Sequence, residues 1–428
     1  MGRSGDDAMA RYRTIAEPRI LDSLVLHAFR DETRFGDAPA ARRRAAAVLE
    51  ELIGLGLKFD STPTGDRVFD PVEVANFICR TGVAGTSDFW RTHCVVSGRA
   101  LVWEAGDSAD GFAAPPGGID QGPGRYRVKL SRTFNMTSQA ATGRMRLRLP
   151  LPIQDAALTD LAVAFTPPAG LAGTFHQAVG FLEARLDLPA PAEVTLAVDL
   201  TFTARGVGPV QGTVRQCDEA DVALYTRPSE GLIHVSPRVT ALARTLADGE
   251  TDPARLVRRF QDHLLNDFVF GSVHYDLVDP ASPLDWVLDH RAFDCQFGSA
   301  LLASLCRASG IPARLVTGYP LYVGTSSFHT WLEVWLDQTG WTPFDLAAWD
   351  LSAGGLDPAW REVFSGRVDA RMVVERPPRL FTGPGGLRLP KAWHLLRAIE
   401  GGGTRYAFHD LATGDLVYSE YVEVIRLD

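Results

Sequence analysis

The chain has 428 residues, too many for one ordinary hydrophobic core, so we expect about three domains. Hydrophobic residues make up 46% of the chain and charged residues 22%, a composition typical of soluble globular proteins. The formal net charge of −9 argues against a protein that binds nucleic acid in bulk. We therefore expect no nucleic-acid partner.

The cysteines follow no regular spacing and include no CxxC pair: Cys79, Cys94, Cys217, Cys295 and Cys306. Their odd number favours a reducing compartment over a disulfide framework. The first residues contain no apolar segment of the signal-peptide kind, and no run of about 18 apolar residues follows them. We expect a cytoplasmic protein with no membrane partner.

Residues 1–110 predict a mostly helical region to which no role can be assigned. The segment "ARRRAAAVLEELIGLGL" (41–57) consists largely of good helix formers and ends near two glycines. A second helix is predicted from "DPVEVANFICR", where Asp70 is the candidate N-cap and Pro71 the first helical residue. A glycine- and proline-rich linker follows at 106–124.

After the linker the hydrophobic period changes from helical to two. It is seen in "RYRVKLSRTF" (125–134), "RMRLRLPLP" (144–152) and "EVTLAVDLTFT" (193–203). Alternation over several strands indicates sheets with one solvated face, so we predict an antiparallel β-sandwich over 120–215. The outward basic residues are interpreted as a solvated face, with a basic docking surface as the alternative: Arg125, Arg127, Lys129, Arg144, Arg146 and Arg148.

From about residue 218 the pattern is helical again. "SPRVTALARTLA" (236–247) and "TDPARLVRRFQDHLLNDF" (251–268) predict two helices, and His263 in the second is interpreted as structural. "GVGPVQG" (206–212) has no helix after it and is not a phosphate-binding loop, so we expect no cofactor. Residues 376–428 predict a β-containing C-terminal extension.

The segment "FDCQFGSALLASLCRASGIPAR" (293–314) predicts one helix, with Asp294 as N-cap and Gly310 as the stop. Cys295 would be its first residue. The free amides and dipole of a helix N-terminus favour an anion, so we expect a lowered pKa for the Cys295 thiol and a site for an oxyanion. Cys306 lies deep in the helix and is interpreted as a packing residue.

A hairpin is predicted downstream, in which "HTWLEVWL" (329–336) and a strand from Trp341 flank the loop "DQTG". An activated cysteine needs a histidine to accept its proton and a carboxylate to orient that histidine, and His329 and Asp345 are the candidates. Pairing Leu336 with Trp341 would put Asp345 on the wrong face.

We therefore predict a register shifted by one residue, with Leu336 opposite Gly340, through an odd-length loop or a bulge. Pro343 cannot donate to a strand ladder and indicates a bulge or an edge position. A zinc site at Cys295, His329 and Asp345 is disfavoured, because no finger or metalloprotease motif is present. The nearby tryptophans are interpreted as core or cleft walls: Trp331, Trp335 and Trp341.

The helix-start cysteine, followed in order by "GIPARLVTGY", "HTWLEVWL" and "GWTPFDL", resembles the transglutaminase-like superfamily of cysteine enzymes over about 285–350. The resemblance implies an α+β catalytic domain of papain-like type at 220–375, and 120–215 is similar to the β-rich domain that often precedes it in bacteria. It also implies that Cys295 is the nucleophile, His329 the general base and acid, and Asp345 the carboxylate.

This chain has Phe293 and Asp294 where members commonly show Gly-Val before the cysteine, and we expect these residues to change the pocket next to the thiol. Gln296 and Tyr275 are candidates for the second oxyanion donor.

The expected function is acyl transfer from an amide of a peptide or protein through a Cys295 thioester, as transamidase or hydrolase. One alternative is amide-bond formation from a carrier-protein thioester in a biosynthetic pathway. The other is a non-catalytic binding module that keeps the fold.

Overall fold

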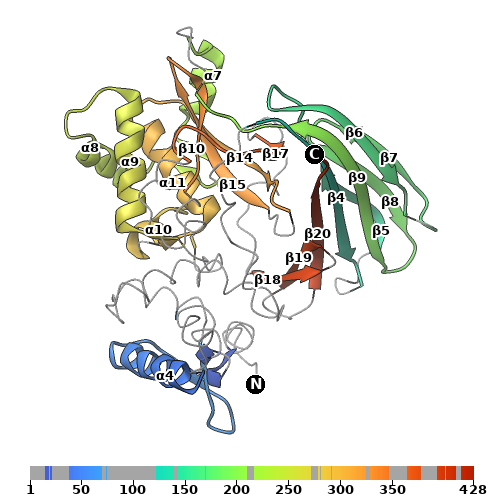
Figure 1. Cartoon of the computed structure of the whole chain (residues 1–428), viewed down its shortest axis with the longest axis horizontal. Helices are drawn as coiled ribbons and strands as arrows, with labels where there is room; N and C mark the ends of the chain where they lie inside the picture. The colour runs from blue at the N-terminus through green and yellow to red at the C-terminus, as the bar shows by residue number, and fades with distance from the viewer. Residues whose placement is uncertain are drawn as a thin grey trace.

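The computed structural model of the chain is shown in Figure 1. It describes residues 15–18, 20–21, 38–69, 74, 122–137, 140, 142–168, 170–209, 216–270, 278–279, 281–290, 292–323, 328–346, 364–376, 393–400, 402–410 and 416–428. A group of helices lies on one side of the molecule and a set of long strands on the other, with a smaller sheet between them (Figure 1).

Two antiparallel sheets form the strand-rich side. Their N-terminal strands are β4 (Gly124–Asn135), β5 (Gly143–Pro150), β6 (Leu158–Thr166), β7 (Gly173–Ala178), β8 (Phe181–Leu188) and β9 (Glu193–Ala204). The order is β18-β19-β20-β4-β9-β6 in one sheet and β5-β8-β7 in the other. The alternation predicted from the sequence is present, because every second residue of β4, β5 and β9 enters one shared hydrophobic core.

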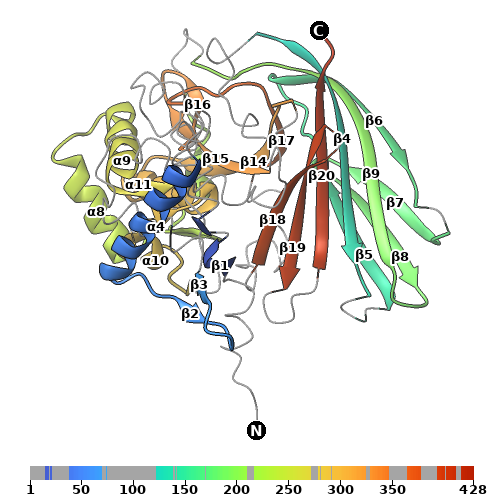
Figure 2. The ribbon, with the colours of Figure 1, turned by 60° about the horizontal axis from the view of Figure 1, so that its bottom comes forward.

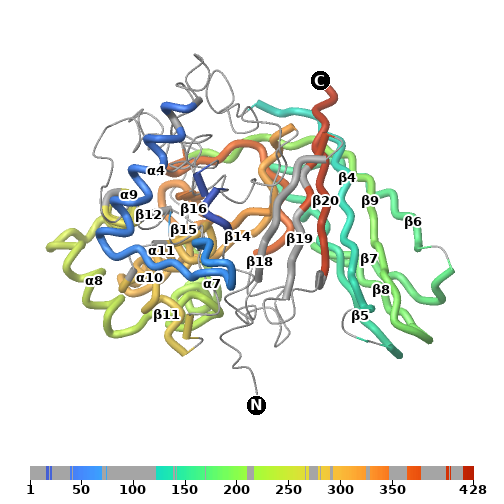
Figure 3. Tube along the Cα trace, turned by 90° about the horizontal axis from the view of Figure 1, so that it is seen from below, coloured from blue at the N-terminus to red at the C-terminus, as the bar shows by residue number. Residues whose placement is uncertain are grey.

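The larger sheet is completed by strands from the end of the chain: β18 (Trp393–Glu400), β19 (Gly403–Asp410) and β20 (Leu416–Arg426). β20 runs antiparallel to β4, with Tyr418 opposite Phe134 and Arg426 opposite Tyr126. The two strands lie side by side in Figures 2 and 3. The C-terminal segment expected as an extension is therefore built into the sheet, a pairing between distant segments that leaves no local sequence signal. The predicted sandwich limits of 120–215 remain a prediction.

The N-terminal region is only partly helical. Helix α4 (Ala38–Gly54) is the first predicted helix, ending three residues earlier than expected. β1 (Ile15–Ala16), β2 (Asp60–Ser61) and β3 (Arg67–Phe69) form a three-stranded sheet that the sequence did not predict, because strands of two or three residues are too short to show a period. The helix predicted from Asp70 lies almost wholly outside the described residues.

The helical side contains α7 (Glu219–Tyr225), α8 (Pro237–Ala247), α9 (Pro253–Asp267), α10 (Asp285–His290) and α11 (Cys295–Ala308), with the two-residue strands β10 (Ser229–Glu230), β11 (Ile233–His234), β12 (Val269–Phe270) and β13 (Ala292–Phe293). Ser236 caps α8 by accepting from the Val239 amide, and Asp252 caps α9 by accepting from the Arg255 amide. Each helix has a proline in its first turn, so both predicted helices are confirmed.

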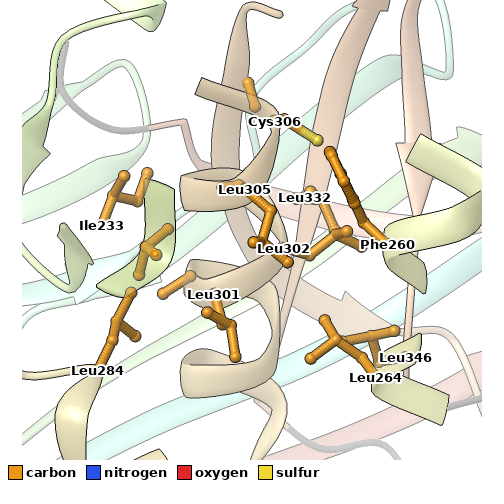
Figure 4. Packing of buried hydrophobic residues seen from close by; sticks show 14 of the residues in the cluster. Ile233, Phe260, Leu264, Leu284, Leu301, Leu302, Leu305, Cys306, Leu332 and Leu346 are labelled. Carbon is orange, nitrogen blue, oxygen red and sulfur yellow. The ribbon is translucent and has the colours of Figure 1, made fainter. Parts of the chain in front are cut away.

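Helix α11 is the centre of this half. Every residue from Phe297 to Arg307 is buried, and Figure 4 shows its leucines packed between Ile233 and Leu284 on one side and Phe260 and Leu332 on the other. Cys306 is fully buried in this cluster, which confirms its interpretation as a packing residue. Burial on all sides fixes where the first turn of α11 points.

A four-stranded antiparallel sheet joins the two halves. Its strands are β14 (Ala313–Pro320), β15 (His329–Leu336), β16 (Gly340–Phe344) and β17 (Arg371–Glu375), in the order β16-β15-β14-β17. Leu332 and Val334 of β15 belong to the helical core, whereas Tyr319 of β14 and Met372 of β17 belong to the core of the large sheets. The sheet is therefore packed into both cores, as its position in Figures 1 and 2 shows.

Among the described residues, no helix has the length and apolar character needed to cross a membrane.

Gly318 allows a close approach of β14 and β17. It pairs with His329 on one side and Val373 on the other, and an added Cβ would collide with the carbonyl oxygen of Met372. Because this contact is with backbone, no rotamer change can relieve it.

We expect Gly318→Ala to lower the free energy of unfolding by about 1–3 kcal/mol, because the strands must separate to admit the methyl group. Urea unfolding followed by circular dichroism measures the change. Gly54→Ala is the control, since no atom lies within 4 Å of an added Cβ there, and its effect should stay within about 0.5 kcal/mol. Equal stability of the two variants would contradict the close approach.

Candidate active site

His329 and Asp345 lie together at one end of the β15–β16 hairpin. Leu336 is opposite Gly340 and Leu332 is opposite Phe344, so the predicted one-residue shift is confirmed. It arises from an odd-length loop, since Gly340 is already paired, and Pro343 stands on an edge strand without a bulge. The His329 Nε2 atom lies 3.0 and 2.9 Å from the two carboxylate oxygens of Asp345.

The hydrogen bond between His329 and Asp345 indicates which imidazole nitrogen carries the proton. An ionised carboxylate can only accept, so Nε2 of His329 carries the proton that it donates to Asp345. Nδ1 is then the ring nitrogen that is left to act as a base in the neutral imidazole. The Asp345 side chain is 1% exposed and that of His329 is 9% exposed, so the pair is shielded from water.

Cys295 is the first residue of α11, as predicted. The Asp294 carboxylate caps the helix by accepting from the amides of Gln296 at 3.0 Å and Phe297 at 2.9 Å. The backbone of Thr330, the residue after His329, and the charge of Asp345 both act on the pKa of the Cys295 thiol. Further along α11, the Ser299 hydroxyl donates to the Thr330 carbonyl at 3.3 Å. The start of α11 therefore lies next to the start of β15, and the triad of Cys295, His329 and Asp345 stays a prediction.

The electrostatics of the thiol differ from the expectation. Burial raises the pKa of Cys295, and the negative charge of Asp294 raises it further, although the Thr330 and Gln296 amides act in the opposite direction. The prediction of a lowered pKa was therefore wrong. The helix N-terminus is present, but a carboxylate caps it next to an enclosed sulfur. A raised pKa favours the protonated thiol over the thiolate.

The oxyanion site predicted at the helix start also has fewer free amide donors than expected. Because Gln296 and Phe297 donate their amides to Asp294, the N–H of Cys295 itself is the first-turn amide left for an oxyanion. Gln296 is partly exposed next to Cys295, and its side chain stays a candidate for the second donor. Tyr275, the other candidate, lies outside the described residues.

Phe293 does not line a pocket at the thiol. It is 1% exposed and belongs to the helical core, where its ring lies over Gly298 and next to Phe268. A Cβ at Gly298 would collide with that ring, so the Phe293 side chain fits only because residue 298 is a glycine. The expectation that Phe293 changes the pocket was wrong, because the residue before the cap turns into the core.

Arg371 is a site residue that sequence reasoning missed. Its Nη1 atom donates to Asp345 at 2.5 Å, on the carboxylate edge that also meets His329. Its guanidinium lies 4.7 Å from the ring centroid of Trp331, which in turn stacks on His329. Arg371 is on β17, outside the hairpin, so no spacing in the sequence could have indicated the contact.

The tryptophans have packing roles, as interpreted. Trp331 is 1% exposed beneath the His329 ring. Trp335 and Trp341 are half-buried and meet edge to face, with Arg314 stacked on Trp341. Within the described ranges, no three His, Cys, Asp or Glu side chains are grouped in a way that could hold a metal ion.

Comparison with known proteins matches residues 240–346 to the transglutaminase-like superfamily. A protein-glutamine gamma-glutamyltransferase of Pseudomonas aeruginosa is 33% identical over 127 residues, a match that covers 26% of this chain and 18% of the relative's length. Residues 240–346, which include Cys295, His329 and Asp345, are thus the part of the chain that matches a transglutaminase-like domain.

Solved structures give more distant likenesses. A candidate cysteine protease from Cytophaga hutchinsonii is 16% identical, with a TM-score of 0.45 over 72% of this chain and 93% of that one. The periplasmic domain of TgpA from Pseudomonas aeruginosa is 17% identical, with a TM-score of 0.32 over 57% of this chain and 93% of that one.

We expect Asp294→Asn to speed alkylation of Cys295 several-fold at pH 7. Asparagine caps a helix about as well as aspartate, but it removes the charge that raises the thiol pKa, so a larger fraction of the sulfur is thiolate. Iodoacetamide labelling read by peptide mass spectrometry gives the rate.

Asp252→Asn is the matched control, because it changes the equivalent cap of α9. The alkylation rate of Cys295 in Asp252→Asn should equal that in the unmodified protein. An unchanged or slower rate in a stably folded Asp294→Asn variant would show that the Asp294 charge does not act on the thiol.

Proposed function

We propose that this chain is a cysteine enzyme that transfers an acyl group from an amide to water or to an amine, through a thioester on Cys295. The observation that carries the proposal is the His329–Asp345 hydrogen bond, which leaves Nδ1 of the imidazole as a base at the strand end where the Thr330 amide meets the sulfur. The superfamily match over 240–346 supports it.

In the first half of the reaction, the Cys295 sulfur attacks the amide carbonyl carbon while its proton moves to Nδ1 of His329. The carbonyl electron pair goes to the oxygen, and the N–H of Cys295 stabilises the oxyanion. When the oxyanion collapses, the C–N bond breaks and the leaving amine takes the proton from His329. The product is a thioester on Cys295 and a free amine.

In the second half, water or a second amine gives a proton to His329 as it attacks the thioester carbonyl. The C–S bond then breaks, and the sulfur takes the proton back from the imidazole. Asp345 accepts a hydrogen bond from Nε2 throughout, which stabilises the imidazolium that forms at each transfer. Water makes the enzyme a hydrolase, and an amine makes it a transamidase.

The raised pKa of the thiol favours this concerted transfer over a preformed thiolate. Cys295 is partly exposed as a residue, although burial of its thiol raises the pKa. We infer a peptide or protein substrate.

The carrier-protein alternative gains no support from the basic strand faces. Arg127 pairs with Asp199 at 2.5 Å, Lys129 with Glu423 at 2.8 Å and Arg148 with Glu183 at 2.9 Å. Charges that are already paired within the sheet offer an acidic carrier little attraction. Burying the charged side chains of Asp345 and Arg371 costs free energy. A non-catalytic binding module has no reaction that would use these charges, so this alternative does not account for the cost.

The alkylation rate of Cys295 tests whether His329 acts as its base. Cys295 should react with iodoacetamide faster than Cys217 at pH 7, and His329→Ala should slow Cys295 at least about tenfold, because the imidazole no longer takes its proton. Cys217 is a free, partly exposed thiol in the same chain and is the internal control. If Cys295 reacts no faster than Cys217, the proposed function fails.

The acyl step has its own test. Incubation with p-nitrophenyl acetate should add one acetyl group to the intact protein and none to Cys295→Ala. A glutamine-containing peptide with dansylcadaverine then separates transamidation, which gives a fluorescent peptide, from hydrolysis, which gives the glutamate peptide.

A further inference from the structure

Behind the His329–Asp345 pair, a line of buried polar groups leads away from the thiol. Arg371 donates from Nη1 to Asp345 at 2.5 Å and from Nε to Asp369 at 2.9 Å. The hydroxyl of Tyr322 donates to the second oxygen of Asp369 at 2.5 Å. Arg371 therefore bridges two carboxylates, one of which holds His329.

The buried charge of Asp345 makes this bridge necessary. A carboxylate that is 1% exposed has lost its hydration, and the one N–H of a neutral imidazole does not replace it. The Arg371 side chain is 2% exposed and supplies a full positive charge. Burial alone would lower the pKa of Arg371, but Asp345 and Asp369 outweigh it and raise the pKa, so the guanidinium stays charged.

The guanidinium has little freedom to turn. Its Cζ atom lies 4.7 Å from the ring centroid of Trp331 and 5.1 Å from that of Phe364, while two of its nitrogens donate to different carboxylates. The planar guanidinium, held in this way, directs its Nη1 hydrogen toward Asp345 in a fixed orientation. A lysine ammonium cannot reproduce this orientation.

The position of Arg371 is set by the other half of the molecule. On and next to β17, Ala370, Met372 and Val374 are buried in the core of the two large sheets. Side chains alternate along a strand, so Arg371 points to the opposite side, toward Asp345. This strand lies beyond the segment that matches the superfamily, which ends at residue 346.

We propose that Arg371 is a positioning residue, which holds the Asp345 carboxylate in the orientation that receives the Nε2 proton of His329 and is itself placed by the core of the large sheets. The role rests on the proposed function, since it orients the base of that reaction. The strand-rich half thereby becomes part of the catalytic machinery.

The positive charge has a measurable consequence for the pair. The ionisable groups around His329 and Asp345 among the described residues are Cys295 and Asp294 at the start of α11, Tyr322 after β14, and Asp369 and Arg371 at β17. Arg371 is the cation of this set, and its Nη1 atom donates to the same Asp345 oxygen that receives the Nε2 proton of His329. Without Arg371 the carboxylate loses the contact that fixes its orientation, so the Nε2–H hydrogen bond should loosen and its proton should exchange faster with water.

The experiment follows the Nε2–H signal of ¹⁵N-histidine-labelled protein by NMR, with His329→Ala used to assign it. The hydrogen bond to Asp345 should keep this signal sharp in the unmodified protein, and in Arg371→Met the signal should broaden through exchange with water. Arg314→Met is the control and should keep the sharp signal, because Arg314 is a partly buried arginine that pairs with Glu333 at 2.6 Å on the opposite part of the sheet.

The alkylation rate of Cys295 tests whether the guanidinium must donate to both Asp345 and Asp369. Arg371→Lys should react at least about fivefold more slowly than the unmodified protein although the charge is kept, because lysine cannot bridge Asp345 and Asp369. A folded Arg371→Met that keeps the sharp Nε2–H signal overturns the proposal, and so does an Arg371→Lys that matches the unmodified rate. If Arg371→Met does not fold, the lysine variant decides alone.

The two proposals can fail separately. If Cys295 of the unmodified protein proves inert, the proposed function is lost, while the Nε2–H signals still show whether Arg371 acts on the His329–Asp345 pair. If Cys295 reacts through His329 and neither Arg371 variant differs from Arg314→Met, only the role of Arg371 is lost.

Discussion

A buried carboxylate shared by a histidine and an arginine is the constraint on which the site depends. Asp345 has almost no contact with water, so it is stable only where His329 and Arg371 both reach it. That requirement brings together a hairpin from one half of the molecule and a strand packed on the other. The site therefore exists only when both hydrophobic cores are formed.

The two cores meet along β14 and β17. Gly318 lets these strands approach at the level of His329, and Tyr319 continues into the core of the large sheets, where its hydroxyl donates to Glu420 of β20. Strands from near the middle and from the end of the chain thus support the same sheet. The superfamily match at 240–346 includes the three residues of the proposed triad, but not β17, which packs behind them.

The start of α11 shows two effects of one carboxylate. Asp294 satisfies two amides of the first turn and fixes where the helix begins, which aims Cys295 at β15. Its charge also raises the pKa of the thiol, together with burial. The same residue therefore fixes the start of the helix and disfavours a resting thiolate, which is why the proposed function assigns the thiol proton to a base.

Local patterns in the sequence determined the elements that surround the candidate site. The cap at Asp294, the stop at Gly310 and the alternation around His329 depend on neighbours within a few residues, and parity alone was enough to predict Leu336 opposite Gly340. Only the tertiary structure decided what surrounds those residues. The bridge from Arg371, the burial of Phe293 and the pairing of β20 with β4 join segments distant in the chain, and desolvation of the thiol depends on everything packed around it.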